Sequence, residues 1–329
     1  MNFWDIALNL LLLVLGFVLL SKGSDFFVDG AASIATRFKI PQLVIGLTVV
    51  AMGTSLPEAA VSVSAALKGT ADITVGNVVG SNILNVLIIL GISAVITPLA
   101  VAPSTLKMEI PIMLGATALF FGLGYSGTIE RWGGIILLVC FISFLALQIY
   151  MARRGMAQES KKDELLEKSG EHAPEQSEKQ PRLWISILFT VIGCGAIILG
   201  SECAVDGATA IAKIIGISDH FIGLTVVALG TSLPELFTSV TAAMKKNADI
   251  AIGNIVGSCI FNILFIAGAA AAIIPVPFQS LFRIDTIVAF VSGAMLLAFS
   301  LGKKRQLGRV GGAVILLSYA AYFAYLVTL

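Results

Sequence analysis

Apolar residues fill this chain in runs of about twenty, and short polar segments separate the runs. A helix needs about 20 apolar residues to cross a bilayer, and continuous runs favour helices over the alternating strands of a barrel. The pattern predicts an all-α integral membrane protein with ten transmembrane helices. The expected spans are 5–22, 41–67, 70–97, 107–126, 131–151, 183–202, 218–244, 248–274, 283–302 and 309–328.

Composition supports this prediction, because 57% of the residues are hydrophobic and only 12% are charged. The four cysteines show no C-x-x-C spacing, so neither a disulfide framework nor a zinc site is indicated. No nucleotide-binding G-x-x-x-x-G-K-[ST] segment is present, which disfavours an ATP-driven pump. We therefore expect no enzymatic activity, no cofactor and no nucleic-acid partner.

Basic residues fall mainly on one side of the predicted membrane. If the N-terminus is extracellular and the ten spans alternate, 17 of the 21 lysines and arginines are cytoplasmic. Lys68, Arg131, Lys213 and Arg283 are the four on the other side. An excess of basic residues marks cytoplasmic loops. Both termini are therefore expected to be extracellular, with the charged linker 153–182 in the cytoplasm.

The chain contains one long internal repeat. Residues 46–91 align with residues 223–268 at an offset of 177, and 30 of the 46 positions are identical. Each copy belongs to a unit of five predicted spans, so the second copy crosses the membrane in the opposite direction. The sequence predicts an N-terminal five-helix repeat (1–152), the linker (153–182) and a C-terminal inverted repeat (183–329). Inverted repeats are common in secondary transporters, which bind substrate where the two copies meet.

The best-preserved segment of the repeat is GTSLPE, at residues 53–58 and 230–235. Pro57 and Pro234 lack an N–H donor and break the surrounding helix, which frees carbonyl oxygens. Such oxygens are tolerated at membrane depth only where they line a protein cavity. An ionisable residue at that depth is a functional candidate, so Glu58 and Glu235 are the leading site residues. The hydroxyls beside them are those of Thr54, Ser55, Thr231 and Ser232.

The following helix of each copy carries a second polar pattern with a spacing of four residues, which keeps its members on one helical face. All of these groups can offer oxygen ligands, which suit hard cations such as Ca²⁺ and Na⁺. Asn77 and Asn254 are equally well explained as hydrogen-bonding contacts between helices. The two sets are Asn77, Ser81 and Asn85, and Asn254, Ser258 and Asn262.

Acidic residues also recur near the membrane surface. Asp25 and Asp29 have Glu202 and Asp206 as their counterparts at the same offset of 177. We interpret these four residues as solvated interfacial charge, which attracts cations only weakly.

Two central carboxylates indicate exchange rather than leak. At about 5 Å and an effective dielectric near 20, bare carboxylates repel by about 3 kcal/mol. One Ca²⁺, several Na⁺ or two protons would neutralise the pair and permit the change between outward-open and inward-open states. The residues alone leave Na⁺ and H⁺ open as counter-ion. A passive cation channel is a weaker alternative, because broken helices in two inverted copies are typical of transporters.

The paired GTSLPE and GN-x-x-GS-x-x-x-N segments resemble the two alpha-repeats of the calcium/cation antiporter superfamily, in particular prokaryotic members of the sodium/calcium exchanger branch. The resemblance implies Na⁺/Ca²⁺ antiport in a prokaryotic plasma membrane by a single chain with no obligatory protein partner. It also implies that the first and sixth helices slide across a core made of the broken helices.

By this resemblance, Glu58 and Glu235 bind Ca²⁺ in competition with Na⁺, together with Thr54 and Thr231. Ser55 and Ser232 would line the same site. The main-chain oxygens of Ala51 and Ala228 would be Na⁺ ligands, Ser81 and Ser258 would flank outer Na⁺ positions, and Asn85 and Asn262 would face the centre. The absence of Asp at the last two positions argues against K⁺ coupling, and GTSLPE departs from the GN-x-x-E type of the proton/calcium branch.

Overall fold

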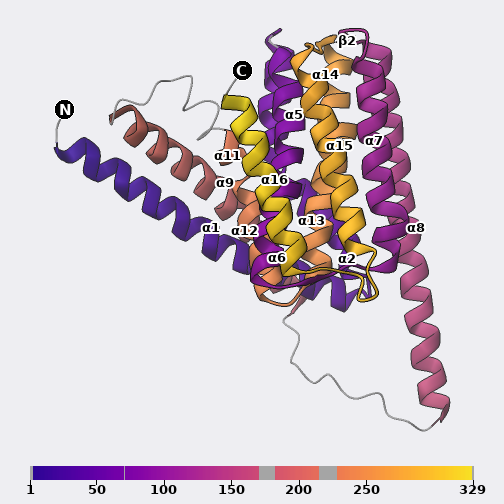
Figure 1. Ribbon diagram of the computed structural model, residues 1–329. Helices are drawn as coiled ribbons and strands as arrows, with labels where there is room; N and C mark the ends of the chain where they lie inside the picture. The colour runs from indigo at the N-terminus through magenta and orange to yellow at the C-terminus, as the bar shows by residue number, and fades with distance from the viewer. Residues whose placement is uncertain (1–2, 70, 170–181, 215–227, 328–329) are drawn as a thin grey trace.

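The computed structural model describes residues 3–69, 71–169, 182–214 and 228–327, which form an almost entirely helical protein (Figure 1). Within these residues eight helices are long and apolar enough to span a membrane, and a bent pair of helices makes a ninth candidate. The expected all-helical membrane protein is therefore confirmed. The seventh expected span, 218–244, falls partly outside the described residues, so the count of ten stays a prediction.

The first half of the chain has the following order of elements. It contains α1 (Phe3–Arg37), α2 (Gln42–Ile45), the π-helical turn η1 (Gly46–Val50), α3 (Ala51–Thr54), α4 (Leu56–Leu67), α5 (Asp72–Leu84), η2 (Asn85–Leu90), α6 (Gly91–Ile96), β1 (Leu99–Ala100), η3 (Thr105–Glu109), α7 (Ile110–Gly124), β2 (Thr128–Ile129) and α8 (Arg131–Ser169).

The second half repeats this order within the described residues, except that η3 has no counterpart before α15. It contains α9 (Leu183–Ile214), α11 (Ala228–Thr231), α12 (Leu233–Met244), α13 (Ala248–Phe261), η5 (Asn262–Ala267), α14 (Gly268–Ile273), β3 (Val276–Pro277), α15 (Leu281–Ser300), β4 (Gln306–Leu307) and α16 (Arg309–Val327). Helix α8 continues through the first part of the predicted linker, 153–182, as far as Ser169.

The repeat helices form the centre of the protein. The span that begins with α13 is 94% buried, and the span that begins with α5 is 72% buried. The span of α16, in contrast, is only 17% buried. Its exposed surface is apolar, as on the other outer helices, because these faces meet lipid rather than water. The outer helices thus enclose a core built from the duplicated segments.

Each half contains a break at the GTSLPE segment. The helical segment that ends at Thr54 and the helix α4 are bent by 52°. Pro57 and Pro234 occupy the first turns of α4 and α12, where a missing N–H costs least. The break therefore falls just before each proline, at Ser55 and Ser232, whose backbone angles depart from the helical values.

Helices α1 and α9 lie against each other along their length (Figure 1). Glycines at intervals of seven residues allow their backbones to touch. A Cβ atom on Gly193 would lie 2.7 Å from the carbonyl oxygen of Gly23, and one on Gly16 would lie 2.7 Å from that of Gly200. Small residues permit such close approach in membranes, so α1 and α9 form one tightly packed pair.

Several contacts recur with the two halves exchanged. Strand β1 pairs antiparallel with β4, and β2 pairs antiparallel with β3. Asn82 and Cys259 are equivalent positions in the repeat, and Asn82 Nδ2 donates to the main-chain oxygen of Cys259 at 3.1 Å. The contact of two equivalent residues marks the place where the two halves of the core meet.

Candidate cation-binding site

The carboxylates of Glu58 and Glu235 lie in the interior of the protein, and each residue is only 1% exposed. They occupy the first turns of α4 and α12, directly after the two helix breaks. The two side chains are close enough for their charges to interact. The structure therefore brings together two glutamates that are 177 positions apart in the sequence.

A serine from the opposite half binds each carboxylate. Ser55 Oγ donates to Glu235 Oε1 at 2.7 Å, and Ser232 Oγ donates to Glu58 Oε1 at 3.5 Å. The Thr231 hydroxyl also interacts with Glu58, and Thr54 with Glu235. The four hydroxyls expected from sequence thus surround the two glutamates, with each half of the chain supporting the carboxylate of the other.

The second oxygen of each carboxylate has no protein hydrogen-bond donor among the described residues. Glu58 Oε2 and Glu235 Oε2 are both buried without a hydrogen-bond partner, as are Asn85 Oδ1 and Asn262 Oδ1. An unpaired buried oxygen is costly, and a bound ion or water would satisfy it. Four bare oxygens from equivalent positions of the two halves are a donor set that fits a hard cation.

Asn77 and Asn254 are used differently from the expected ligands. Asn77 Nδ2 donates to the main-chain oxygen of Glu58 at 3.1 Å and to Ser62 Oγ at 2.8 Å. Asn254 Nδ2 makes the equivalent bonds to Glu235 O at 3.4 Å and Ser239 Oγ at 2.9 Å. These amides join the glutamate-bearing helix to the next helix, as the interpretation of interhelical contact predicts. They hold the main chain of the site in place.

Thr54 and Ala51 connect the two halves further. Thr54 Oγ1 donates to Asn254 Oδ1 at 3.0 Å. The main-chain oxygen of Ala51 accepts from Ser258 Oγ at 3.3 Å, so this oxygen faces the second half of the chain. Ala228 is the first residue of α11, and the segment before it lies outside the described residues. Ser81 is buried on α5.

Asn85 and Asn262 begin the two π-helical turns η2 and η5. Such turns occur frequently at functional sites. Asn262 Nδ2 donates to Asn82 Oδ1 at 3.1 Å, which leaves the Asn262 Oδ1 oxygen unbound by protein among the described residues. The two asparagines predicted to face the centre therefore each present a bare buried oxygen.

Two buried polar residues, Asn82 and Glu109, were not predicted from the sequence. Asn82 contacts both Cys259 and Asn262, but it was not singled out because its counterpart in the repeat is not an asparagine. Glu109, in η3, is the third fully buried carboxyl among the described residues. An acidic residue inside the apolar segment 107–126 was the signal that would have identified it.

The prediction of interfacial charge is only partly correct. Glu202 and Asp206 are exposed, as expected. Asp25 and Asp29 are also accessible to solvent, but both form an ion pair with Lys245, at 3.3 and 2.7 Å. Attraction between the end of α12 and the side of α1 was not evident from sequence, because nothing in the pattern shows that these helices are neighbours.

Comparison with known proteins gives the family. The family model described as sodium/calcium exchanger protein matches residues 8–150 and 185–328. This chain belongs to that family. The family consists of antiporters rather than enzymes, which agrees with the resemblance drawn from the repeats.

Full-length relatives of this family member carry consistent names. A putative antiporter, CaxA, from Alkalimonas amylolytica is 38% identical over 94% of this chain and 95% of its own length. The sodium/calcium exchanger MaX1 from Methanosarcina acetivorans is 33% identical over 98% of this chain and 99% of its own length. The chain is thus similar to these two relatives over almost their whole length.

Solved structures of the sodium–calcium exchanger NCX_Mj have the same fold. One of them, from crystals soaked with Na⁺ and Sr²⁺, aligns with a TM-score of 0.82 at 32% identity. The alignment covers 97% of this chain and 99% of that one. The helical arrangement described above is therefore that of a known exchanger over almost its entire length.

Proposed function

We propose that this member of the family exchanges Na⁺ for Ca²⁺ across a plasma membrane, by alternating access around Glu58 and Glu235. The observation that carries the proposal is the pair of bare buried oxygens, Glu58 Oε2 and Glu235 Oε2, at the junction of the two broken helices. A divalent cation between them would balance the negative charges of both carboxylates. No positively charged group among the described residues is shown in contact with either of them.

The surrounding oxygens favour ions of this class. Hydroxyls, asparagine amides and main-chain carbonyls suit Ca²⁺ and Na⁺, whereas Zn²⁺ prefers His and Cys. No group of three or more His, Cys, Asp or Glu side chains is placed to hold a metal ion among the described residues. With Asn85 and Asn262 as neutral donors, the charge of the site is that of two glutamates, which one Ca²⁺ or two monovalent cations would balance.

The proposed membrane arrangement has ten spans in two inverted five-helix repeats, with both termini outside and the linker in the cytoplasm. The charge distribution supports this orientation. The exchange of contacts between halves supports the inversion, since β1 pairs with β4 while β2 pairs with β3. The eight described spans, the bent ninth candidate and the expected span 218–244 would together give the count of ten.

Sodium is proposed as the counter-ion because MaX1 and NCX_Mj are named as sodium/calcium exchangers and match nearly the whole chain. The deciding experiment is flux into liposomes that contain the purified protein and internal Na⁺. After dilution into Na⁺-free medium at clamped membrane potential, Ca²⁺ uptake should require internal Na⁺. If uptake is driven only by a pH gradient, the counter-ion is H⁺ instead of Na⁺. Conductance that needs no counter-ion would indicate a channel.

A further inference from the structure

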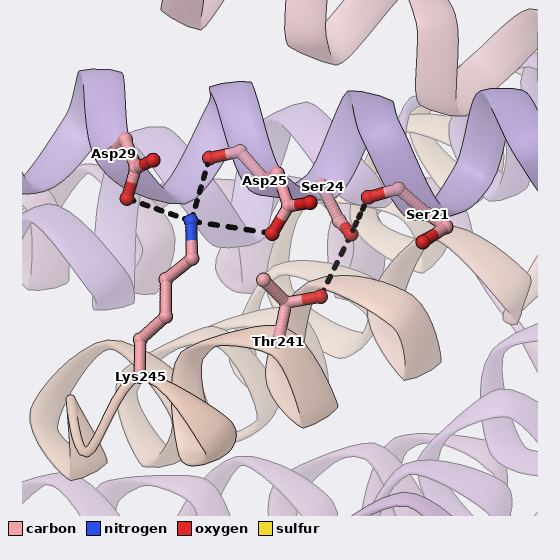
Figure 2. Close-up of polar contacts among 6 residues, drawn as sticks. All are labelled: Ser21, Ser24, Asp25, Asp29, Thr241 and Lys245. Atoms are coloured by element: carbon pink, nitrogen blue, oxygen red, sulfur yellow. Dashed lines mark hydrogen bonds and ion pairs between the residues drawn. The ribbon is translucent and has the colours of Figure 1, made fainter.

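One lysine connects helix α1 of the α1–α9 pair to the core. Lys245, at the end of α12, lies 2.7 Å from Asp29 Oδ1 and 3.3 Å from Asp25 Oδ1 on α1. It also donates to the main-chain oxygen of Asp25 at 3.1 Å (Figure 2). We call Asp25, Asp29 and Lys245 the cytoplasmic cluster, from its place in the proposed orientation.

Further contacts hold the same two helices together. The hydroxyls of Ser24 and Thr241 lie 2.8 Å apart, one turn from the lysine (Figure 2). The rings of Phe17 and Phe237 are 6.0 Å apart. Helix α1 therefore contacts α12, the helix that carries Glu235, through a series of matched groups.

Every polar member of this contact has a counterpart in the other half. At an offset of 177 residues, the counterpart of the lysine is a lysine, the counterparts of the two acidic residues are acidic, and the counterparts of the two hydroxyl residues carry hydroxyls. These counterparts belong to α4 and α9, and in the proposed topology they lie toward the extracellular side. The pairs are Lys245 with Lys68, Asp25 with Glu202, Asp29 with Asp206, Ser24 with Ser201, and Thr241 with Ser64. We call Lys68, Glu202 and Asp206 the extracellular cluster.

The extracellular cluster is open in this structure. Lys68, Glu202 and Asp206 are exposed, and within the described residues none of them forms an ion pair. Ser201 donates to the main-chain oxygen of Gly230 at 2.6 Å instead of contacting Ser64. The end of α1 nearest the N-terminus also stands away from the helix bundle, whereas the other end meets it (Figure 1).

We propose that the two clusters are alternating ion-pair contacts, so that when α1 and α9 move to the opposite-facing state, Lys68 binds Glu202 and Asp206 while Lys245 releases Asp25 and Asp29. The inference rests on the proposed alternating access. Its reason is the inverted repeat: exchanging the conformations of two equivalent halves converts each contact of one half into the equivalent contact of the other.

The clusters suit a contact that must form and break in each cycle. Exposed ion pairs stabilise weakly, so a pair of this kind biases two conformations without locking either. Removal of one cluster should change the ratio of the two states by about fivefold, which corresponds to about 1 kcal/mol. Like other exposed pairs, both clusters should weaken at high salt.

Cross-linking tests the proposal without relying on transport. In the full chain with its four native cysteines replaced, one variant carries Lys68→Cys and Asp206→Cys, and a second carries Asp29→Cys and Lys245→Cys. A short bis-methanethiosulfonate reagent is used, because a lysine–aspartate contact spans more than a disulfide allows. The second pair should link rapidly in the conformation described here. The first should link slowly, and adding Lys245→Gln should increase its rate about fivefold.

The matched control is Lys246→Gln, which alters the neighbouring exposed lysine outside the cluster. It should leave the rate of the Lys68→Cys, Asp206→Cys pair unchanged. In the reverse direction, Lys68→Gln should speed linking of the Asp29→Cys, Lys245→Cys pair. The proposal is overturned if the extracellular pair never links while the cytoplasmic pair does, or if Lys245→Gln and Lys246→Gln act equally.

These outcomes are distinguishable from failure of the proposed function. If liposome flux identifies H⁺ or another ion, reciprocal cross-linking would still support the two clusters. If exchange of Na⁺ for Ca²⁺ is found but cross-linking is not reciprocal, the antiport assignment stands and the clusters are structural contacts only.

Discussion

Ser55 Oγ donates to Glu235 Oε1 at 2.7 Å, so a hydroxyl at the break in one half orients the carboxylate of the other half. The equivalent bond from Ser232 to Glu58 is longer, at 3.5 Å. The two glutamates are therefore not held equally in this conformation, although their sequence surroundings are nearly identical.

This difference predicts unequal effects of the two serines. Ser55→Ala should raise the Ca²⁺ concentration for half-maximal flux by about tenfold, since hydrogen bonds to charged groups contribute about 1.5–3 kcal/mol. Ser232→Ala should have a smaller effect. The measurement is initial Ca²⁺ uptake at varied external Ca²⁺. Equal effects would mean that the longer bond shortens when the ion binds.

The glutamates themselves give the strongest prediction. Glu58→Gln and Glu235→Gln each remove one charge while keeping the side-chain shape, so each should abolish Ca²⁺ exchange. Both variants should remain folded in the membrane, as checked by size-exclusion chromatography and thermal unfolding. Normal exchange by both would refute the assignment of the site.

Asn254 is predicted to be a stability residue as well as a neighbour of the site. Asn254→Leu would leave Ser239 and Thr54 without their amide partner in a buried position. The expected loss is about 1–3 kcal/mol, seen as a lower thermal unfolding temperature in detergent. Ser143→Ala is the control, since that exposed hydroxyl bonds only its own helix among the described contacts. A similar unfolding temperature for both variants would contradict the prediction.

The α1–α9 contact predicts a sharp difference between two glycines on one helix. A Cβ atom on Gly193 would lie 2.5 Å from Phe27 N, whereas one on Gly195 would meet no described atom within 4 Å. Gly193→Ala should therefore destabilise the protein by about 1–3 kcal/mol. Gly195→Ala should be neutral or slightly stabilising, because alanine favours helix. Thermal unfolding of the two variants side by side makes the comparison.

The linker is predicted to be dispensable for transport. Deletion of residues 158–178 removes the part of α8 beyond the apolar span that ends at Arg154, and leaves the repeat helices intact. The rate of Ca²⁺ uptake should stay within about twofold of the full chain. Loss of uptake by a well-folded deletion variant would assign the linker a role in transport.

Much of the fold and of the candidate site could be predicted because the sequence contains an internal duplication. The duplication identified Glu58, Glu235 and the flanking hydroxyls, and Pro57 and Pro234 located the breaks. Two kinds of contact could not be predicted from the duplication: those of residues that differ between the two copies, and those that depend on which helices are neighbours. Asn82 has Cys259 as its counterpart, and the ion pair of Lys245 with α1 depends on a helix approach that periodicity does not encode.

The glycine contact between α1 and α9 has a consequence for leakage. Because the two helices touch through their backbones, displacement of one carries the other with it. In the proposed alternating access, the two helices would therefore move across the core as one body. The close contacts that couple the two helices are those of the glycines at 16, 23, 193 and 200. A bulky residue at one of these positions should therefore produce uncoupled ion flow as well as slower exchange.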